Sequence, residues 1–547
     1  MQRDLQRLAT ATFHAIVAGG GVYGLTIAHE LARRGMTVCL VERDDFAAGT
    51  SFNSLKTLHG GIRELQQGAL SRVRQFVRER REIARLAPHL VRVLPFVIPT
   101  SRRHPRPLMR AFLAGYDLVA RDRNEGVDPS QRLPASRVMS RAECLDLNPL
   151  IDARGVTGGA LWHDYQLHSP ERLAIALVES MVRREAAAIN YTEILAVLRG
   201  PHAVSGVRVR DRLSGEAFDV RAPLVINAAG PWASEILRRS EAGLPPDRRP
   251  GWSLAMNLVV DLPPLPAAVG GLTGGRFLFM VPWRAASIAG TSHGPAPPEG
   301  GAASISEREV DAFLAEVKSA FPNANLSRDA IRLVHRGLLP APAGSRDGLT
   351  LLKDSLVHDH APEGFKGLLT VVGARYTTAG ATARAVAALV DRRGAPSPSD
   401  ADSRRLPAAD MGDLNQFVHE QMSSTGADPE LLRRLISSYG TGFRAVLRLM
   451  DERPALAASL GPACQLTGAE VVRAVREEMA VTLADALVRR TGAGAGGHPG
   501  QDAARTAAVL MSTELGWSAS QVDRELQALD SFYGIPGVRP GSDQGQT

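Results

Sequence analysis

Residues 15–24 read AIVAGGGVYG, and this stretch decides the fold of the chain. The first four residues are apolar and predict a buried strand. Gly19, Gly21 and Gly24 follow with G-x-G-x-x-G spacing. At a strand–helix junction such glycines permit a tight turn, the approach of backbone N–H groups to a pyrophosphate, and close packing of helix on strand. Because a helix N-terminus also attracts anions, the stretch predicts a dinucleotide site.

The residues that follow complete a βαβ unit. Residues 22–34 have helical periodicity, Gly35 caps the helix, and the apolar run 37–41 predicts a second strand. Glu42 comes directly after that strand, where a carboxylate accepts a hydrogen bond from a ribose hydroxyl and repels a 2′-phosphate, so NADP is not expected. The residues predicted to hold the nucleotide here are Gly19, Gly21, Val22, Tyr23, Gly24, Glu42 and Arg43.

Length and composition indicate a soluble globular protein with more than one domain. The 547 residues are 44% hydrophobic and 22% charged, which leaves ample chain for large cores. The net charge of +7 suits an anionic substrate or a membrane surface. The positive charge is too diffuse to indicate nucleic-acid binding, and no zinc, RNA-binding or helix-turn-helix signature accompanies it.

The cysteines and the absence of long apolar runs predict a cytoplasmic location. Cys39, Cys144 and Cys464 are scattered without a CxxC pair, which is typical of a reducing compartment. Residues 1–12 contain no apolar signal core, and no run of eighteen apolar residues predicts a transmembrane helix. Neither metal-ligand spacing nor a nucleophile elbow appears.

One segment indicates peripheral contact with the inner face of a membrane. Residues 99–124 are basic and carry interleaved apolar residues, the pattern of a surface amphipathic helix. Packing of the same helix on its own domain is the alternative. The residues that make the pattern are Arg102, Arg103, Arg106, Leu108, Met109, Arg110, Phe112, Leu113 and Tyr116.

Nucleotide-fold signals appear again far from the N-terminus. Residues 224–230 and 368–373 are apolar runs that end in glycine, and a helix of small residues follows at 377–392. A β-rich stretch lies between them, an order that does not suit a simple NAD dehydrogenase but suits an FAD-binding fold. We expect an FAD-binding domain with inserted segments at 12–250, a β-rich substrate domain at 251–340, the returning FAD-domain strand and helix at 341–393, a linker at 394–412, a helical C-terminal domain at 413–533, and a disordered tail at 534–547.

Six motifs resemble the FAD-dependent glycerol-3-phosphate dehydrogenases, members of the D-amino-acid-oxidase-like superfamily. The resemblance covers nearly the whole chain. The motifs are VERDDFAAGTS at 41–51, KTLHGGIR at 56–63, RLAPHLV at 85–91, NAAGPW at 227–232, GARYTT at 373–378, and VREEMAVTLAD at 475–485.

The resemblance implies an α/β fold of the D-amino-acid-oxidase and glutathione-reductase type. An antiparallel β-rich substrate domain is inserted in it, and an all-helical domain follows. It also implies FAD as cofactor, hydride transfer from an alcohol carbon to flavin N5, and a quinone or another acceptor for the electrons. The further residues expected to contact FAD are Thr50, Ser51, Asn53, Ser54, Lys56, Ala229, Gly230, Trp232, Gly373, Tyr376, Thr377 and Thr378.

The substrate half of the family pattern is altered. Leu339 stands where the family has the phosphate-binding arginine of a G-V-R-P-L stretch, so a bidentate anion clamp is replaced by an apolar side chain. Arg336 is an odd number of residues away, so on a regular strand it faces the opposite side. Glycerol 3-phosphate is therefore in doubt as the substrate. The other departures are Asn257 for histidine, Glu64 for tyrosine, His293 for aspartate, and Arg375 for lysine.

The candidate catalytic residues follow from the same motifs. His59 precedes two glycines that allow close approach to a cofactor, and it is either a proton acceptor or a structural histidine. Arg63 could bind an anionic substrate group or pair with Glu64 on a surface. Arg375 could stabilise reduced flavin or hold a substrate oxygen. His293 and Asn257 complete the catalytic set, although His293 could instead be an exposed loop residue. Leu339, Lys353 and Glu64 are expected to line the substrate pocket.

Two other functions remain open from the sequence. The same fold could oxidise the C–N bond of an amine or amino acid. Alternatively, the loss of an arginine at 339 could mark a flavin-binding module without dehydrogenase activity. The sequence leaves the substrate, the acceptor and the oligomeric state unassigned.

Overall fold

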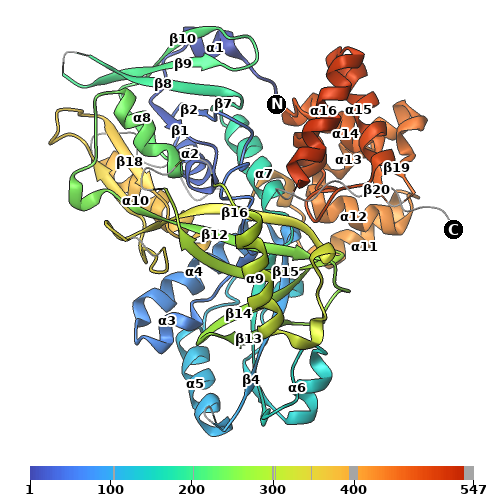
Figure 1. The fold of residues 1–547 in the computed structure, drawn as a ribbon. Helices are drawn as coiled ribbons and strands as arrows, with labels where there is room; N and C mark the ends of the chain where they lie inside the picture. Colours follow the sequence, from blue (N-terminus) through green and yellow to red (C-terminus); the bar gives the residue numbers. More distant parts are fainter. Residues whose placement is uncertain are drawn as a thin grey trace.

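The computed structural model describes residues 1–102, 105–200, 202–297, 301, 303–345, 348–392, 405–462 and 464–534. Figure 1 shows a nucleotide-type sheet with its helices in the upper part, a large second sheet below it, and a block of helices beside the first. Arg103, most of the predicted linker at 394–412 and the predicted tail after residue 534 lie outside the described residues.

The predicted βαβ unit lies at the centre of a six-stranded sheet. Its strand order is β17-β18-β11-β1-β2-β7, and every neighbouring pair is parallel except β17 with β18. The core strands are buried on both faces, which explains their continuous apolar sequences. The strands are β1 (Ala15–Ala18), β2 (Val38–Val41), β7 (Ala187–Ile189), β11 (Val225–Asn227), β17 (Leu356–Asp359) and β18 (Leu368–Val372).

Three helices and a small sheet complete this part. Helix α2 (Val22–Arg33) packs between α7 (Pro170–Val182) and α10 (Ala379–Asp391). Their apolar faces join the strands in one hydrophobic cluster. An antiparallel sheet covers the other side with β8 (Thr192–Arg199), β9 (Val204–Asp211) and β10 (Ala217–Arg221).

The second sheet has nine strands, in the order β16-β12-β15-β14-β13-β4-β6-β3, with β5 paired to β6. It is antiparallel except where β4 meets β13. The predicted β-rich stretch supplies β12 to β16, and earlier inserted segments supply β3 to β6. The strands are β3 (Thr57–Leu58), β4 (Val91–Thr100), β5 (Arg137–Met139), β6 (Gly158–Leu167), β12 (Gly251–Val260), β13 (Ala268–Thr273), β14 (Arg276–Trp283), β15 (Ala286–Pro295) and β16 (Ile331–Ala341).

Further helices surround the two sheets. Helix α9 packs on β13 and β14 through buried Phe313 and Val317. Helix α5 packs on its own domain, because Leu113 and Tyr116 are buried against β6 and α4. These helices are α1 (Leu5–Thr10), α3 (Ile62–Gln66), α4 (Leu70–Leu86), α5 (Arg106–Val119), α6 (Arg141–Leu147), α8 (Ala233–Arg239) and α9 (Glu307–Ala320).

The C-terminal part is almost entirely helical, as predicted. Within the described residues its only strands are the short pair β19 (Ser459–Gly461) and β20 (Cys464–Thr467). Among the described residues, no helix combines the length and the apolar character needed to cross a membrane. The helices are α11 (Leu414–Ser424), α12 (Pro429–Tyr439), α13 (Phe443–Glu452), α14 (Gly468–Glu478), α15 (Gln501–Leu515) and α16 (Ala519–Tyr533), with a π-helix at Asp485–Arg490.

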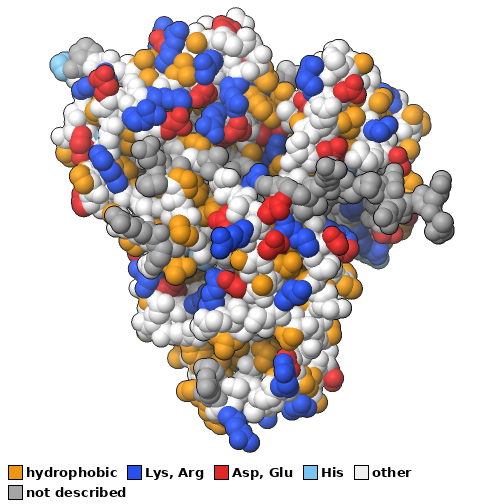
Figure 2. Space-filling model, in the orientation of Figure 1, with side chains coloured by type: hydrophobic (Ala, Val, Ile, Leu, Met, Phe, Trp, Pro, Cys, Tyr) orange, Lys and Arg blue, Asp and Glu red, His pale blue; other side chains and the backbone are white. Residues whose placement is uncertain are grey.

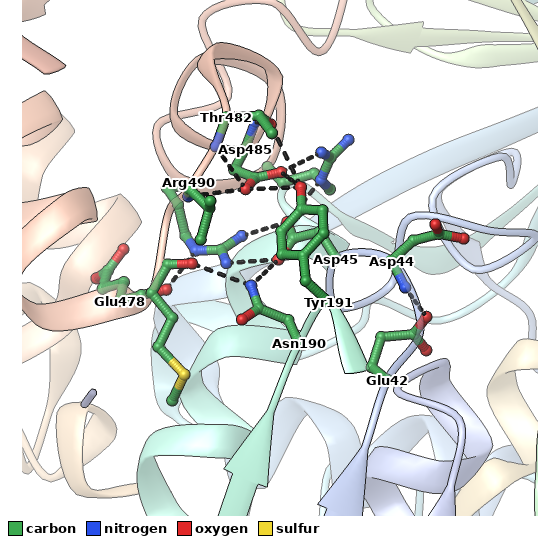
Figure 3. Close-up of polar contacts among 12 residues, drawn as sticks. Glu42, Asp44, Asp45, Asn190, Tyr191, Glu478, Thr482, Asp485 and Arg490 are labelled. Atoms are coloured by element: carbon green, nitrogen blue, oxygen red, sulfur yellow. Dashed lines mark hydrogen bonds and ion pairs between the residues drawn. The ribbon is translucent and has the colours of Figure 1, made fainter. Parts of the chain in front are cut away.

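A buried ion-pair network joins this helical part to the nucleotide-type part (Figure 3). Asp45 follows β2 and accepts two parallel hydrogen bonds of 2.7 Å each from the guanidinium of Arg490. Arg489 donates a further hydrogen bond of 2.6 Å to the same carboxylate, and Asn190 donates another of 3.0 Å. Tyr191 reaches across to Asp485 at 2.8 Å. Asp45, in the motif at 41–51, therefore holds the C-terminal helices against the nucleotide-type part.

Candidate active site

A cavity of about 1040 Å³ lies between the two sheets. The carboxyl ends of β1, β2, β11 and β18 form one wall, which is the edge of a parallel sheet where ligands usually bind. The facing wall comes from β12, β14, β15 and β16 of the second sheet, and α5 closes one end. The cavity is thus large enough to hold both a cofactor and a substrate.

The glycine motif shapes the nucleotide end of the cavity. Gly19 has φ +101°, and a Cβ on it would lie 2.7 Å from the carbonyl oxygen of Ala228. A Cβ on Gly24 would lie 1.8 Å from the carbonyl oxygen of Gly19, so this glycine lets α2 pack on β1. Gly21 precedes α2, and Ser51 accepts a 2.9 Å hydrogen bond from the N–H of Val22.

Glu42 is held by backbone donors at the end of β2. Its two carboxylate oxygens accept hydrogen bonds from the N–H of Gly20 at 2.6 Å and of Asp44 at 2.8 Å. Burial raises the pKa of Glu42 to about 7. Arg43 lies beside it, with its guanidinium 4.9 Å from the ring centroid of Trp232. These side chains line the cavity where the sequence predicts the ribose.

Tyr23 connects the two distant pieces of the nucleotide fold. Its hydroxyl donates to the carbonyl oxygen of Arg375 at 2.7 Å and accepts from the N–H of the same residue at 3.0 Å. Ser355 donates to that hydroxyl at 3.0 Å. A Cβ on Gly373 would lie 2.1 Å from the Tyr23 ring, which explains the glycine there. The loop after β18 is therefore fixed against the start of α2.

His59 faces the cavity and is positioned by a buried acid. Its Nδ1 is 3.7 Å from Asp164 on β6, and its side chain is 46% exposed to the cavity. Asp164 also forms an ion pair with Arg80 and accepts a 2.7 Å hydrogen bond from the N–H of Gly60. Burial alone would raise the pKa of Asp164, but Arg80 and His59 hold it below its usual value. The acid is therefore ionised and can orient the imidazole.

Two arginines in the cavity differ in how their charge is balanced. Arg375 forms a 3.2 Å ion pair with the buried Glu64. Arg63 has its guanidinium 5.5 Å from the Phe279 ring centroid. Across the described parts of the chain, Arg63 has neither a hydrogen bond nor an ion pair. Burial, and then the nearby Arg375, lower the pKa of Arg63. An anion in the cavity would relieve this uncompensated charge.

His293 and Asn257 lie on neighbouring strands of the second sheet. The expectation of an exposed loop for His293 is wrong, because β15 continues through it and pairs His293 with Ala255. Burial, and then Arg276 and Arg63, lower the pKa of His293 to about 4, so the ring is neutral near pH 7. Asn257 is 2% exposed and accepts a 2.7 Å hydrogen bond from Thr291.

The register of β16 decides which residue replaces the family arginine. Leu339 pairs with Ser253 in an unbroken stretch of the ladder and lines the cavity. Arg336 pairs with Met256 and is exposed outside the residues that line the cavity. Because the ladder has no bulge at Gly337, the two side chains face opposite sides of the sheet. Arg336 therefore does not replace the missing arginine.

Most of the residues singled out from the sequence meet in this one cavity. They are His59, Arg63, Arg375, His293, Asn257, Gly19, Gly21, Val22, Tyr23, Glu42, Arg43, Thr50, Ser51, Asn53, Ser54, Ala229, Gly230, Trp232, Gly373, Tyr376, Thr377, Leu339 and Glu64.

Four of the predicted residues lie outside the cavity lining. Lys56 has φ +59°, so its side chain turns away and donates to the carbonyl oxygen of Phe52 in a buried site. Burial lowers the pKa of Lys56 to about 8. Lys353 is exposed and donates to Gln67 at 2.8 Å. Thr378 caps the loop at the carbonyl oxygen of Arg375, and Gly24 has the packing role described above.

Sequence reasoning missed three features of the site. Asp164 and Arg80, which position His59, are far from it in sequence and carry no local motif. Arg276 at the start of β14 adds a cation near His293. An apolar wall closes the end of the cavity next to α5. It is formed by Phe96, Ile98, Met109, Phe112, Leu113, Trp162, Phe277 and Phe279.

The residues present fit FAD on structural grounds. The glycine turn leaves space that a Cβ would fill, the N-terminus of α2 opens into the cavity, and Glu42 offers carboxylate oxygens beside it. The Tyr23 contacts then hold the loop at Gly373 at the far end of the same cavity. A cavity of this volume, lined by these groups, suits a dinucleotide.

Comparison with known proteins also indicates an FAD-binding fold. Residues 14–389 match the family described as FAD dependent oxidoreductase. Residues 399–522 match the C-terminal domain of alpha-glycerophosphate oxidase. Both matches agree with the division between the sheets and the C-terminal helices.

Full-length relatives are glycerol-3-phosphate dehydrogenases. One from Synechocystis is 29% identical over 550 residues, covering 97% of this chain and 98% of the relative. One from Mycobacterium leprae is 30% identical over 531 residues, covering 95% and 88%. The crystal structure of the Bacillus halodurans glycerol-3-phosphate dehydrogenase with FAD has the same fold, with a TM-score of 0.76, 22% identity and 98% of both chains covered. The chain therefore belongs to the family of FAD-dependent glycerol-3-phosphate dehydrogenases, within the FAD-dependent oxidoreductases that act on a CH–OH group.

Proposed function

We propose that this enzyme oxidises an alcohol carbon in a small substrate that carries an anionic group. The observation that carries the proposal is Arg63, a guanidinium in the cavity whose charge no described residue balances. Arg276 and His293 lie near it, and Leu339 lies on the same wall as His293. FAD, when bound, accepts the hydride that leaves the carbon.

The chain supplies proton transfer and orientation. Oxidation of an alcohol releases the hydroxyl proton as the hydride leaves, so a base must stand beside the reacting carbon. His59 is the candidate, because it faces the cavity and Asp164 holds its Nδ1 side. That arrangement leaves Nε2 free to accept the proton. Arg63 anchors the anionic group of the substrate. The charge of the neighbouring Arg375 is balanced by its ion pair with Glu64.

Leu339 makes glycerol 3-phosphate a poor fit. A charge-assisted bidentate contact contributes on the order of 1.5–3 kcal/mol, and its loss corresponds to roughly tenfold to a hundredfold in affinity. We therefore expect weak turnover of glycerol 3-phosphate. The Leu339→Arg variant should lower the KM for glycerol 3-phosphate by at least tenfold, measured with an artificial electron acceptor.

The control for this experiment is Arg336→Leu, which changes a side chain outside the cavity and should leave the KM unchanged. Efficient wild-type turnover at micromolar glycerol 3-phosphate would contradict the expected loss of affinity at Leu339 and assign phosphate binding to Arg63 and Arg276. Bleaching of the flavin by amines but not by polyol phosphates or other hydroxy acids would instead favour C–N oxidation.

The apolar wall suggests where the electrons go. Its aromatic and aliphatic side chains suit a quinone or another apolar acceptor better than a charged substrate.

Figure 2 shows apolar side chains gathered on the outer surface over the lower part of the molecule, near β13, β4 and α5. Leu108, Leu118 and Leu272 are each more than half exposed. Arg106 and Arg110 are exposed on α5, and Arg102 is exposed just before it.

We also propose that this surface contacts the inner face of a membrane, which would bring an apolar acceptor to the cavity. Each arginine near an anionic membrane surface contributes about 1 kcal/mol to the free energy of membrane binding. Co-sedimentation with anionic liposomes should fall at high salt and in a variant with these three arginines changed to glutamate. Binding that is indifferent to both changes would exclude the proposal.

A further inference from the structure

A cluster of two histidines and a glutamate lies on the hairpin between β17 and β18, outside the cavity lining. His358 is on β17, and His360 extends that strand by donating its N–H to Leu368. Side chains two residues apart on a strand share a face. The two imidazole centroids are accordingly 4.5 Å apart, at 87° to each other. Glu363 returns toward them from the turn.

His360 presents a buried nitrogen without a partner. The side chain is 0% exposed, and its Nε2 lies 2.8 Å from the hydroxyl of Thr370. Its Nδ1 forms no hydrogen bond within the described part of the chain and lies 4.0 Å from the Glu363 carboxylate. An unsatisfied buried acceptor is destabilising. A metal-binding histidine usually donates its second ring N–H to a polar group behind it, and the Thr370 hydroxyl can accept that N–H from Nε2 of His360.

The three donor atoms are close enough to share one ion. His358 Nε2 is 3.2 Å from a Glu363 oxygen, and one ligand atom from each of the three residues lies within 4.8 Å of the others. In a tetrahedral zinc site with bonds of about 2.0–2.1 Å, neighbouring ligand atoms are about 3.3 Å apart. The His358–Glu363 pair already has that spacing. Glu363 is one-third exposed, which opens the fourth position to water.

We propose that His358, His360 and Glu363 bind a single Zn²⁺ ion, with Thr370 orienting His360. Two neutral imidazoles and one carboxylate are a donor set that zinc prefers over magnesium or calcium. An ion pair between His358 and Glu363 alone would leave the His360 nitrogen unpartnered.

The ion would hold together the β17–β18 hairpin, which leads into the loop after β18. β18 runs from this hairpin to Gly373 and Arg375 at the cavity. Fixing the β17–β18 turn therefore stabilises the strand from which that loop projects. We assign the zinc a structural role, because the cluster lies outside the residues that line the cavity.

The test begins with the tag-free, FAD-loaded enzyme, which is stripped of metal by a chelator. Zn²⁺ is then added back, and unbound zinc is removed by gel filtration. We expect one Zn²⁺ per chain to be retained and the melting temperature to rise relative to the stripped enzyme. X-ray absorption at the zinc edge should show nitrogen and oxygen ligands with imidazole scattering and no sulfur. Retention of no zinc, or a sulfur ligand, would overturn the proposal.

Matched variants locate the site. His358→Gln and Glu363→Gln should each weaken zinc binding at least tenfold and remove the thermal shift. His419→Gln changes an exposed histidine on α11, far from the cluster in sequence, and should leave both unchanged. His360→Gln tests the buried ligand, but this change can also unfold the hairpin. The variants at His358 and Glu363 therefore decide whether the cluster binds the ion. Wild-type zinc affinity in both of those variants would show that the ion binds elsewhere.

Discussion

At the scale of single residues, His59 is the position on which the proposed chemistry depends. The His59→Asn variant should retain FAD, because the side chain is away from the glycine turn, and should reduce flavin by substrate about 10²- to 10⁴-fold more slowly. Stopped-flow flavin bleaching measures this rate directly. His419→Asn serves as the matched control on the surface and should behave as wild type. An undiminished rate in His59→Asn would leave His59 with a structural role beside Asp164.

A second prediction at this scale concerns Gly21. A Cβ there already lies 3.3 Å from the Ser51 hydroxyl, so the branched side chain of Gly21→Val would fill the space beside the N-terminus of α2. The variant should be purified without FAD and should fail to take it up. Gly115→Ala adds a methyl group on α5 where nothing lies within 4 Å, and it should retain full FAD content. The absorption spectrum of the purified protein distinguishes the outcomes.

At the scale of elements, Tyr23 joins α2 to the loop after β18 through one hydroxyl. Tyr23→Phe removes both hydrogen bonds to the Arg375 backbone, at a cost of about 1–3 kcal/mol if the freed groups stay buried. The dissociation constant for FAD should rise about tenfold or more, as measured by fluorescence quenching of the free flavin. Ser355→Ala leaves the Tyr23–Arg375 contacts in place and should have a smaller effect. Equal effects of the two changes would mean that the loop is held by other contacts.

At the scale of the whole molecule, the association of the C-terminal helices with the nucleotide-type part depends on ionised buried carboxylates. Burial alone would raise the pKa of Asp45, but Arg490 and Arg489 hold it well below its usual range. Arg172 and Arg473 likewise hold the pKa of Glu478 at about 2. Both values lie below those of the unfolded chain, near 3.9 for Asp and 4.3 for Glu.

The sign of the pH dependence follows from these depressed values. The carboxylates stabilise the fold fully above about pH 5, and this contribution is lost as the pH falls toward 2. Unfolding in urea should therefore show a free energy that falls steeply between pH 5 and pH 3. The Asp45→Asn variant should lose about 3–5 kcal/mol at pH 7, because it leaves buried arginines uncompensated. The free energy of unfolding of this variant should also depend less steeply on pH than that of the wild type. An equal dependence would mean that other groups cause the loss of stability in acid.

The βαβ unit with its dinucleotide site was predictable from the sequence, because its signals are local. Strand, glycine turn, helix and Glu42 fall within thirty residues, and each is specified by short-range sterics and hydrogen bonding. The opposite orientation of Leu339 and Arg336 was also predictable, since side chains alternate along a strand. The predicted fold class is confirmed by the same strands and by the family match.

The tertiary structure alone decided the environment of the reacting groups. Asp164 and Arg80 meet His59 only because β6 and α4 pack beside it, and nothing in the local sequence specifies that contact. His293 lies on a strand, despite the glycine and prolines that follow it, because β12 supplies its partner. Lys56 turns away from the cavity because its backbone is left-handed and the surrounding core accepts its side chain. Contacts between residues far apart in sequence are set by how elements pack, which local patterns do not encode.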